Sequence, residues 1–129
     1  MANTQSIQFF LKSEKNEKEI LNFLGSKIGF LVESTDIEVP DSVGFAQISS
    51  HTQGFEQSIL VTWPHGVELA LAPDAMIKFM AARLDVAVLL EPNIDGDAWL
   101  LAQPDGSVKS TNVRYLDDGI DLSNIQQHP

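Results

Sequence analysis

The residues best suited to binding or chemistry in this 129-residue chain are acids in turn-forming sequence. Two lie in the stretch Glu91-Pro-Asn-Ile-Asp-Gly-Asp97, and two more stand directly before Gly119. Asp favours turns in any protein, so solvated turn chemistry is one interpretation. The other is a binding surface, because alternate hairpin ends of a meander meet at one edge of a sheet. We predict one partner-binding acidic rim made of four turn residues: Asp95, Asp97, Asp117 and Asp118.

The acids around residue 95 also resemble the first half of a calcium-binding loop. Oxygen-bearing side chains alternate from Glu91 to Asp97, and Gly96 occupies the sixth position. The twelfth position is Ala102, where such a loop needs a bidentate glutamate, and the residues after Gly96 predict a strand and not a helix. We therefore interpret this stretch as a hairpin turn, and we predict a protein without a metal site or a cofactor.

The histidines form no metal-binding pattern in the sequence. His51, His65 and His128 are far apart and lack the i, i+4 spacing of zinc ligands. His65 stands between a proline and a glycine, where a turn residue is the more common role than a general base. The sequence also lacks the short signatures of α/β-hydrolases, dinucleotide sites and phosphate loops. We predict no catalytic residues, and an enzyme with a site near His65 is the alternative from a different class.

The charge balance is the most unusual bulk property of the chain. Eight basic residues oppose eighteen acidic ones, for a formal net charge of −10. Residues 1–27 hold four lysines and three glutamates, whereas residues 28–129 hold four basic and fifteen acidic residues. Such a field repels phosphate backbones and anionic lipid and attracts basic proteins. We expect a basic protein partner, and neither nucleic acid nor a membrane surface, and we make no prediction of the oligomeric state.

Three further features bear on the compartment. The chain has no cysteine, which excludes disulfides and thiolate sites and fits a reducing environment. Residues 1–6 are polar and lack the basic and apolar regions of a secretory signal. The longest wholly apolar runs are far shorter than the roughly 20 residues of a membrane-spanning helix. The sequence predicts a soluble cytoplasmic protein.

The elements that must position these residues centre on Pro73 to Tyr115. Pro73 suits the first turn of a helix, and Asp74 complements the positive end of the helix dipole. Apolar residues then recur at spacings of three and four, which predicts a helix over 73–84 with one face on a sheet. The predicted stripe comprises Met76, Ile77, Met80 and Leu84, widened by Phe79 and Ala81.

Three strands are predicted after this helix. Residues 86–90 are apolar throughout, which is typical of a central strand covered on both faces. Residues 98–103 return after the turn at 91–97, and Pro104-Asp-Gly106 predicts a second hairpin into one long polar strand over 107–116. Asp117-Asp-Gly119 ends that strand. Trp63 and Trp99 occupy alternating apolar strands, so we predict that both belong to the core.

The first half of the chain predicts a helix over 17–24, capped by Asn16 and stopped at Gly25. Strands are predicted over 7–11, 28–33, 42–50, 57–63 and 67–71, with an acidic loop at 34–41. Runs of adjacent strands with only two helices favour an α+β fold, in which two helices pack on a largely antiparallel sheet. We expect a single domain over residues 1–129, with 123–129 as a flexible tail.

Residues 71–91, followed by Ala98-Trp-Leu-Leu and Pro104-Asp-Gly106, carry a helix, strand and hairpin pattern over about a third of the chain. This pattern resembles a segment of small bacterial immunity proteins of polymorphic and contact-dependent toxin systems. The resemblance implies a cytosolic, acidic, non-enzymatic protein that covers or distorts the active site of a toxin. It assigns no functional residue of that family to a position in this chain.

In size, charge and α+β content the chain also resembles small acidic secretion chaperones. It departs from that group because it lacks a clear C-terminal helix, since residues 123–129 are short and polar. A chaperone or adaptor for a secreted protein is therefore the second binding hypothesis.

Overall fold

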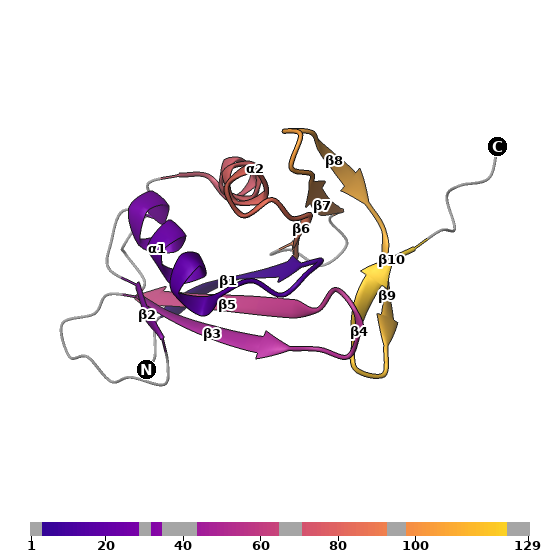
Figure 1. Cartoon of the computed structure of the whole chain (residues 1–129), viewed down its shortest axis with the longest axis horizontal. Helices are drawn as coiled ribbons and strands as arrows, with labels where there is room; N and C mark the ends of the chain where they lie inside the picture. Colours follow the sequence, from indigo (N-terminus) through magenta and orange to yellow (C-terminus); the bar gives the residue numbers. More distant parts are fainter. Residues whose placement is uncertain (1–3, 29–31, 35–43, 65–70, 93–97, 124–129) are drawn as a thin grey trace.

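The computed structural model describes residues 4–28, 32–34, 44–64, 71–92 and 98–123, which form a large sheet, a small sheet and two helices (Figure 1). The predicted α+β class, with helices packed on a largely antiparallel sheet, is confirmed. The elements in chain order are β1 (Thr4–Leu11), α1 (Glu17–Ile28), β2 (Val32–Ser34), β3 (Gly44–Ser50), β4 (Gln53–Gly54), β5 (Gln57–Pro64), α2 (Pro73–Leu84), β6 (Val88–Leu90), β7 (Trp99–Ala102), β8 (Val108–Thr111), β9 (Val113–Leu116) and β10 (Gly119–Leu122).

The large sheet has seven strands in the order β2-β3-β5-β1-β6-β7-β8. Its neighbouring strands are antiparallel except β2 and β3, which run parallel. β1 lies at the centre, paired with β5 along its whole length and with β6 over Phe9 to Leu11. The N-terminal strand therefore joins two halves of the chain that are far apart in sequence.

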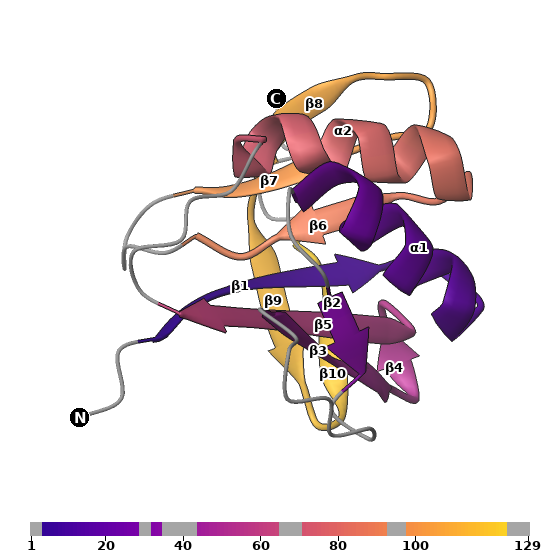
Figure 2. The same cartoon turned by 90° about the vertical axis from the view of Figure 1, so that its left-hand side faces the viewer.

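β1 shows why the molecule has two cores. Ile7, Phe9 and Leu11 lie on the face that packs against both helices, whereas Phe10 lies on the opposite face and packs with Phe55. This alternation follows from the two-residue period of a strand. The helices cover one face of the large sheet, and the small sheet crosses the other face (Figure 2).

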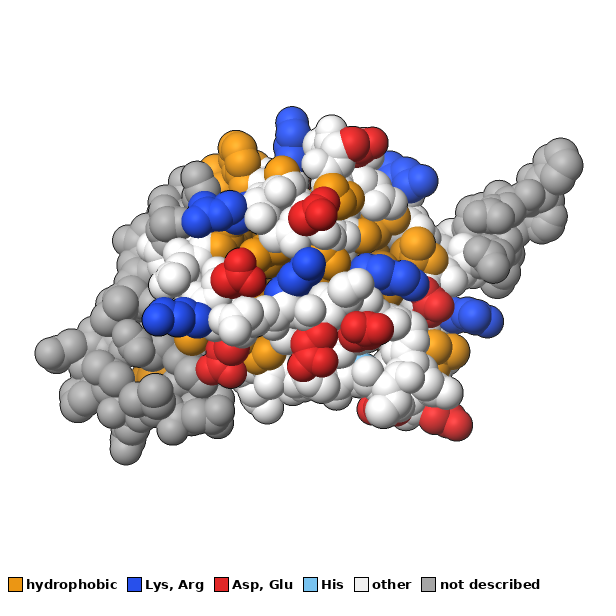
Figure 3. Space-filling model, in the orientation of Figure 1, with side chains coloured by type: hydrophobic (Ala, Val, Ile, Leu, Met, Phe, Trp, Pro, Cys, Tyr) orange, Lys and Arg blue, Asp and Glu red, His pale blue; other side chains and the backbone are white. Residues whose placement is uncertain are grey.

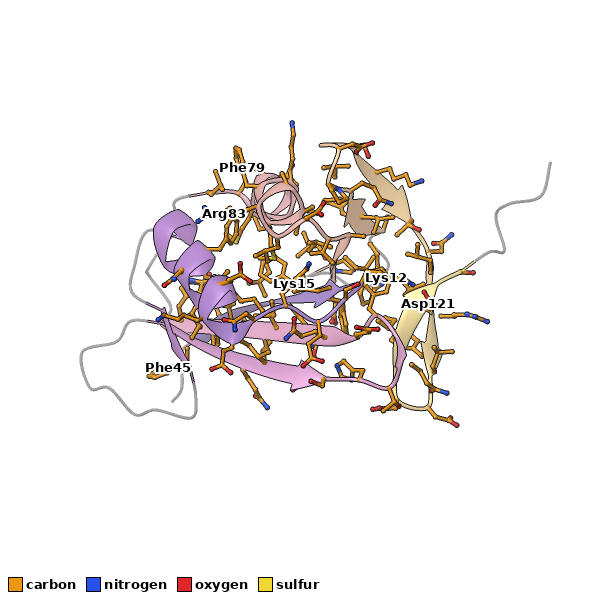
Figure 4. All side chains as sticks on the ribbon, in the orientation of Figure 1. Lys12, Lys15, Phe45, Phe79, Arg83 and Asp121 are labelled. Atoms are coloured by element: carbon orange, nitrogen blue, oxygen red, sulfur yellow. The ribbon has the colours of Figure 1, made fainter. Side chains whose placement is uncertain are left out.

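Helix α2 spans the predicted residues and buries all but one of the predicted stripe. Met76, Met80 and Ala81 are fully buried on the large sheet. Phe79 contradicts the prediction, because 46% of its surface is exposed and it lies on the outer side of α2 (Figure 4). Successive helical positions are 100° apart, so the residue directly before Met80 points well away from the sheet. Asp85 then ends the helix in the left-handed conformation, with φ of 55°.

Helix α1 has the predicted start and a later end. The Asn16 side-chain oxygen accepts hydrogen bonds from the amides of Lys18 (2.8 Å) and Glu19 (3.3 Å), which confirms the N-cap. The predicted stop at Gly25 is wrong, because the helix continues to Ile28. Ile28 is therefore helical. The strand predicted over 28–33 is confirmed at residues 32 and 33, which belong to β2, and residues 29–31 lie outside the described ranges.

The segment after α2 matches the prediction closely. β6 is buried on both faces, with Val88 in the core under the helices and Leu89 in the core under the small sheet. β6 and β7 pair antiparallel, and β7 pairs with β8 through the predicted turn at 104–106. In that turn Gly106 has a positive φ of 97°, which favours glycine.

The single long strand predicted over 107–116 is wrong. The chain leaves the large sheet after β8 and passes through Asn112 into β9, which belongs to the small sheet. The small sheet has the order β4-β10-β9, and neither β4 nor β10 was predicted. β10 runs antiparallel to β9 and parallel to β4. The pairing of β10 with β4 joins residues 119–120 to residues 53–54, which are far apart in sequence.

Several predictions concern residues outside the described ranges. These are the acidic loop at 34–41 apart from Ser34, the strand at 67–71 apart from Leu71, and the tail at 123–129 apart from Ser123. His65, His128, Asp95 and Asp97 also lie outside the described residues. The positions of these four side chains stay predictions.

Candidate partner-binding site

Two of the four residues predicted for the acidic rim, Asp117 and Asp118, form the turn of the β9–β10 hairpin. This hairpin lies at the right of Figure 1, with its turn at the lower end and the β7–β8 turn at the opposite, upper end. Its inner side packs on the large sheet through Val113, Ile120 and Leu122. The hairpin therefore forms one end of the molecule and closes the second core.

Asp118 attaches the hairpin turn to the chain between β3 and β4. Its Oδ2 accepts hydrogen bonds from the Thr52 amide (2.8 Å) and hydroxyl (2.6 Å). Its own amide donates to the side-chain oxygen of Gln53 (3.0 Å), and its carbonyl accepts from the Gln53 amide (3.3 Å). Four hydrogen bonds thus hold the turn in place, although Asp118 is exposed to solvent.

Acidification should weaken the attachment of this turn. The Thr52 hydroxyl, then the Thr52 amide and the nearby His51, lower the pKa of the Asp118 carboxyl. A folded-state pKa below the unfolded value gives stability that is present at neutral pH and is lost as the pH falls through the lowered value. Thermal unfolding from about pH 7 to about pH 3 should therefore cost the parent more stability than Asp118→Asn, which cannot titrate. Equal losses in the two proteins would contradict this role of Asp118.

His51 lies behind the turn in an arrangement that resembles a Ser-His-Asp triad. Its Nε2 is 2.8 Å from Ser58 Oγ, and its Nδ1 is 3.8 Å from Asp118 Oδ1. Ser58, however, is only 5% exposed, so a substrate carbonyl cannot approach its hydroxyl. The 3.8 Å separation also exceeds hydrogen-bond range. His51 is therefore hydrogen-bonded to Ser58 of β5 and lies close to the Asp118 carboxylate of the hairpin turn, without the geometry of a catalytic triad.

An aromatic row leads from the second core to the surface of the hairpin. The ring centroids of Phe10 and Trp99 are 5.9 Å apart, and those of Trp99 and Tyr115 are 6.5 Å apart in an edge-to-face arrangement. Trp63 is buried as predicted, whereas Trp99 is only half-buried. Tyr115 is 76% exposed. Its signal in the sequence is the one aromatic residue in the strand predicted over 107–116.

A second contact joins the hairpin to the end of β1. Lys12 Nζ lies 3.8 Å from Asp121 Oδ1, and Figure 4 shows these side chains pointing toward one another. The same ammonium lies 5.2 Å from the centroid of the buried Phe55 ring, within cation–π range. The hairpin is thus held at its turn by Asp118 and along β10 by Asp121.

Asp117 differs from Asp118 in having no such role. It is exposed, and no salt bridge reaches it within the part of the chain that the structure describes. Acidic and basic side chains alternate over the face shown in Figure 3, with acidic ones at the lower end of the hairpin. Asp117 therefore presents a carboxylate to solvent, two residues after the exposed Tyr115.

The described residues give little support for a metal site, a deep pocket or a membrane-spanning helix. Among residues 4–28, 32–34, 44–64, 71–92 and 98–123, no group of three or more histidines and acids could hold a metal ion. A shallow hollow of about 210 Å³ lies between β1, β5 and the residues after β6, and it is lined by Ser6, Ile7, Gln8, Leu60, Glu91 and Pro92. No helix in the described ranges is long and apolar enough to cross a membrane.

Comparison with known proteins assigns no family or function to this chain. No family model, no curated protein and no solved structure matches the chain.

Proposed function

We propose that the protein is a non-enzymatic binding module that captures a basic protein through the β9–β10 hairpin. The observation that carries this proposal is the exposed Tyr115 ring, 76% accessible to solvent, two residues before the exposed Asp117 in the same hairpin. Tyrosine is enriched among residues that dominate binding energy, because its ring contributes a large contact area with little loss of conformational freedom. A carboxylate in the same hairpin favours a partner that presents lysine or arginine. The net charge of −10 acts in the same direction.

The way in which the hairpin is held supports the same function. Asp118 holds its turn and Asp121 holds β10, so the hairpin that carries Tyr115 and Asp117 is positioned before a partner arrives. Such preorganisation reduces the entropy that binding must offset. In the interpretation as an immunity protein, the partner is a toxin whose surface the hairpin occupies. In the interpretation as a chaperone, it is a secreted protein that is still unfolded.

The test is capture by the immobilised protein at low salt, followed by elution with increasing salt. We expect the captured protein to be basic and to be released by salt. If the toxin interpretation is right, the neighbouring gene encodes it. Tyr115→Ala should weaken its binding by about thirtyfold, the effect of losing a residue worth about 2 kcal/mol. Phe79→Ala is the matched control, because it removes an exposed ring from α2. Equal binding by both variants would contradict a site at the hairpin.

A further inference from the structure

The register of the small sheet shows which backbone groups of β9 are unpaired. The Ser123 amide donates to the Asn112 carbonyl (2.9 Å), so these opposed residues form a hydrogen-bonded pair. In an antiparallel ladder such pairs alternate with non-bonded ones. Arg114 opposite Asp121 is therefore a bonded pair, and Val113 and Tyr115 direct their amide and carbonyl groups away from β10.

These outward groups lie along an open edge. β9 is the last strand of the small sheet, and no described strand pairs with it on the side away from β10. Natural proteins commonly protect such edges with proline, bulges or unpaired charge. β9 contains no proline, and its one charged residue, the exposed Arg114, is at a position whose amide and carbonyl face β10 and not the outer edge. The edge can therefore accept another strand.

The side chains along this edge indicate which strand it would accept. An added strand would have the apolar side chains of Val113 and Tyr115 as neighbours on one of its faces. One end of it would lie near Asp117, whose carboxylate forms no salt bridge with the described residues. A second copy of this chain would bring another net charge of −10 to the same place. The complementary occupant is an extended segment with apolar residues at alternate positions and a basic residue at its end.

We infer that a basic partner protein binds by adding an extended segment as a fourth strand to the small sheet, along the outer edge of β9. Backbone hydrogen bonds to Val113 and Tyr115 would supply the pairing, and the Tyr115 ring and Asp117 would select the segment. This inference rests on the proposed function and adds the mode of binding to it.

The test uses a peptide of alternating valine and threonine flanked by lysines, with a glutamate-flanked peptide as its control. The lysine peptide should shift the amide resonances of Val113 and Tyr115 and slow their hydrogen exchange. Val113→Pro removes an outward amide, which an edge strand tolerates, and should weaken peptide binding at least tenfold. Ser110→Pro is the matched control. Because the Gln103 amide donates to the Ser107 carbonyl, Ser110 likewise directs its amide outward, but from β8.

The results of this test distinguish strand addition from other modes of binding and from self-association. Unchanged exchange at Val113 and Tyr115 in the parent with the lysine peptide would overturn strand addition, whether or not Val113→Pro folds. If the captured basic protein still depended on Tyr115, the proposed function would stand without this mode of binding. Protection of both amides in the chain alone, increasing with its concentration, would assign the edge to a second copy and overturn the inference. Equal weakening by Val113→Pro and Ser110→Pro would also overturn it.

Discussion

Met80→Asp should prevent stable folding, whereas Phe79→Asp at the preceding position should cost much less. Met80 is fully buried between α2 and the large sheet, and an unpaired carboxylate there costs several kcal/mol. That cost is comparable to the whole stability of a domain, about 5–15 kcal/mol. Urea unfolding followed by circular dichroism measures the difference between the two variants. A Met80→Asp protein that unfolds like the parent would contradict the packing of α2.

Gly119→Ala should detach the β9–β10 hairpin from β4. Gly119 has φ of 152°, and a Cβ at this position would overlap the Gln53 carbonyl oxygen. Gly54 has φ of 67°, and its Cβ would overlap the Ile120 carbonyl oxygen, so each strand has a glycine where it approaches the backbone of the other. A strained backbone conformation alone costs about 1–3 kcal/mol, and the overlap with backbone adds to this cost.

Gly25→Ala is the matched control for this prediction. Gly25 lies within α1, and a Cβ there meets no atom within 4 Å. Alanine should therefore stabilise the helix by about 0.5–1 kcal/mol. Thermal unfolding should show opposite shifts for the two variants. A Gly119→Ala protein as stable as the parent, with a hairpin still docked in its amide spectrum, would contradict the close approach of β4 and β10.

The sequence predicted the segments whose signal is local. The apolar period of 73–84, the continuous apolar run before Leu90 and the turn at Pro104 each reflect a preference of neighbouring residues. The stop at Gly25 failed because burial of Ile20, Phe23 and Leu24 holds the helix in place, and an exposed glycine within it costs only about 1 kcal/mol.

The small sheet could not be predicted because its signals are not local. Nothing near Asn112 shows that the chain leaves one sheet for another, since β9 gains its partner only when residues 119–122 return beside it. The carboxylate of Asp118 is bound by Thr52, which is 66 positions away in the sequence. The turn at 117–118 was predicted from its composition, but the different roles of its two acids depend on this distant contact.

The most direct test of partner binding at the β9–β10 hairpin is the association rate of the captured basic protein at increasing salt. Two variants should associate more slowly and with weaker salt dependence, with smaller effects on dissociation. One is Asp117→Asn, and in the other all four residues of the acidic rim are changed to Asn. Asp105→Asn, which removes one exposed charge from the opposite β7–β8 turn, should have a smaller effect. Unchanged association rate and salt dependence in the fourfold variant would contradict the acidic rim as the binding surface.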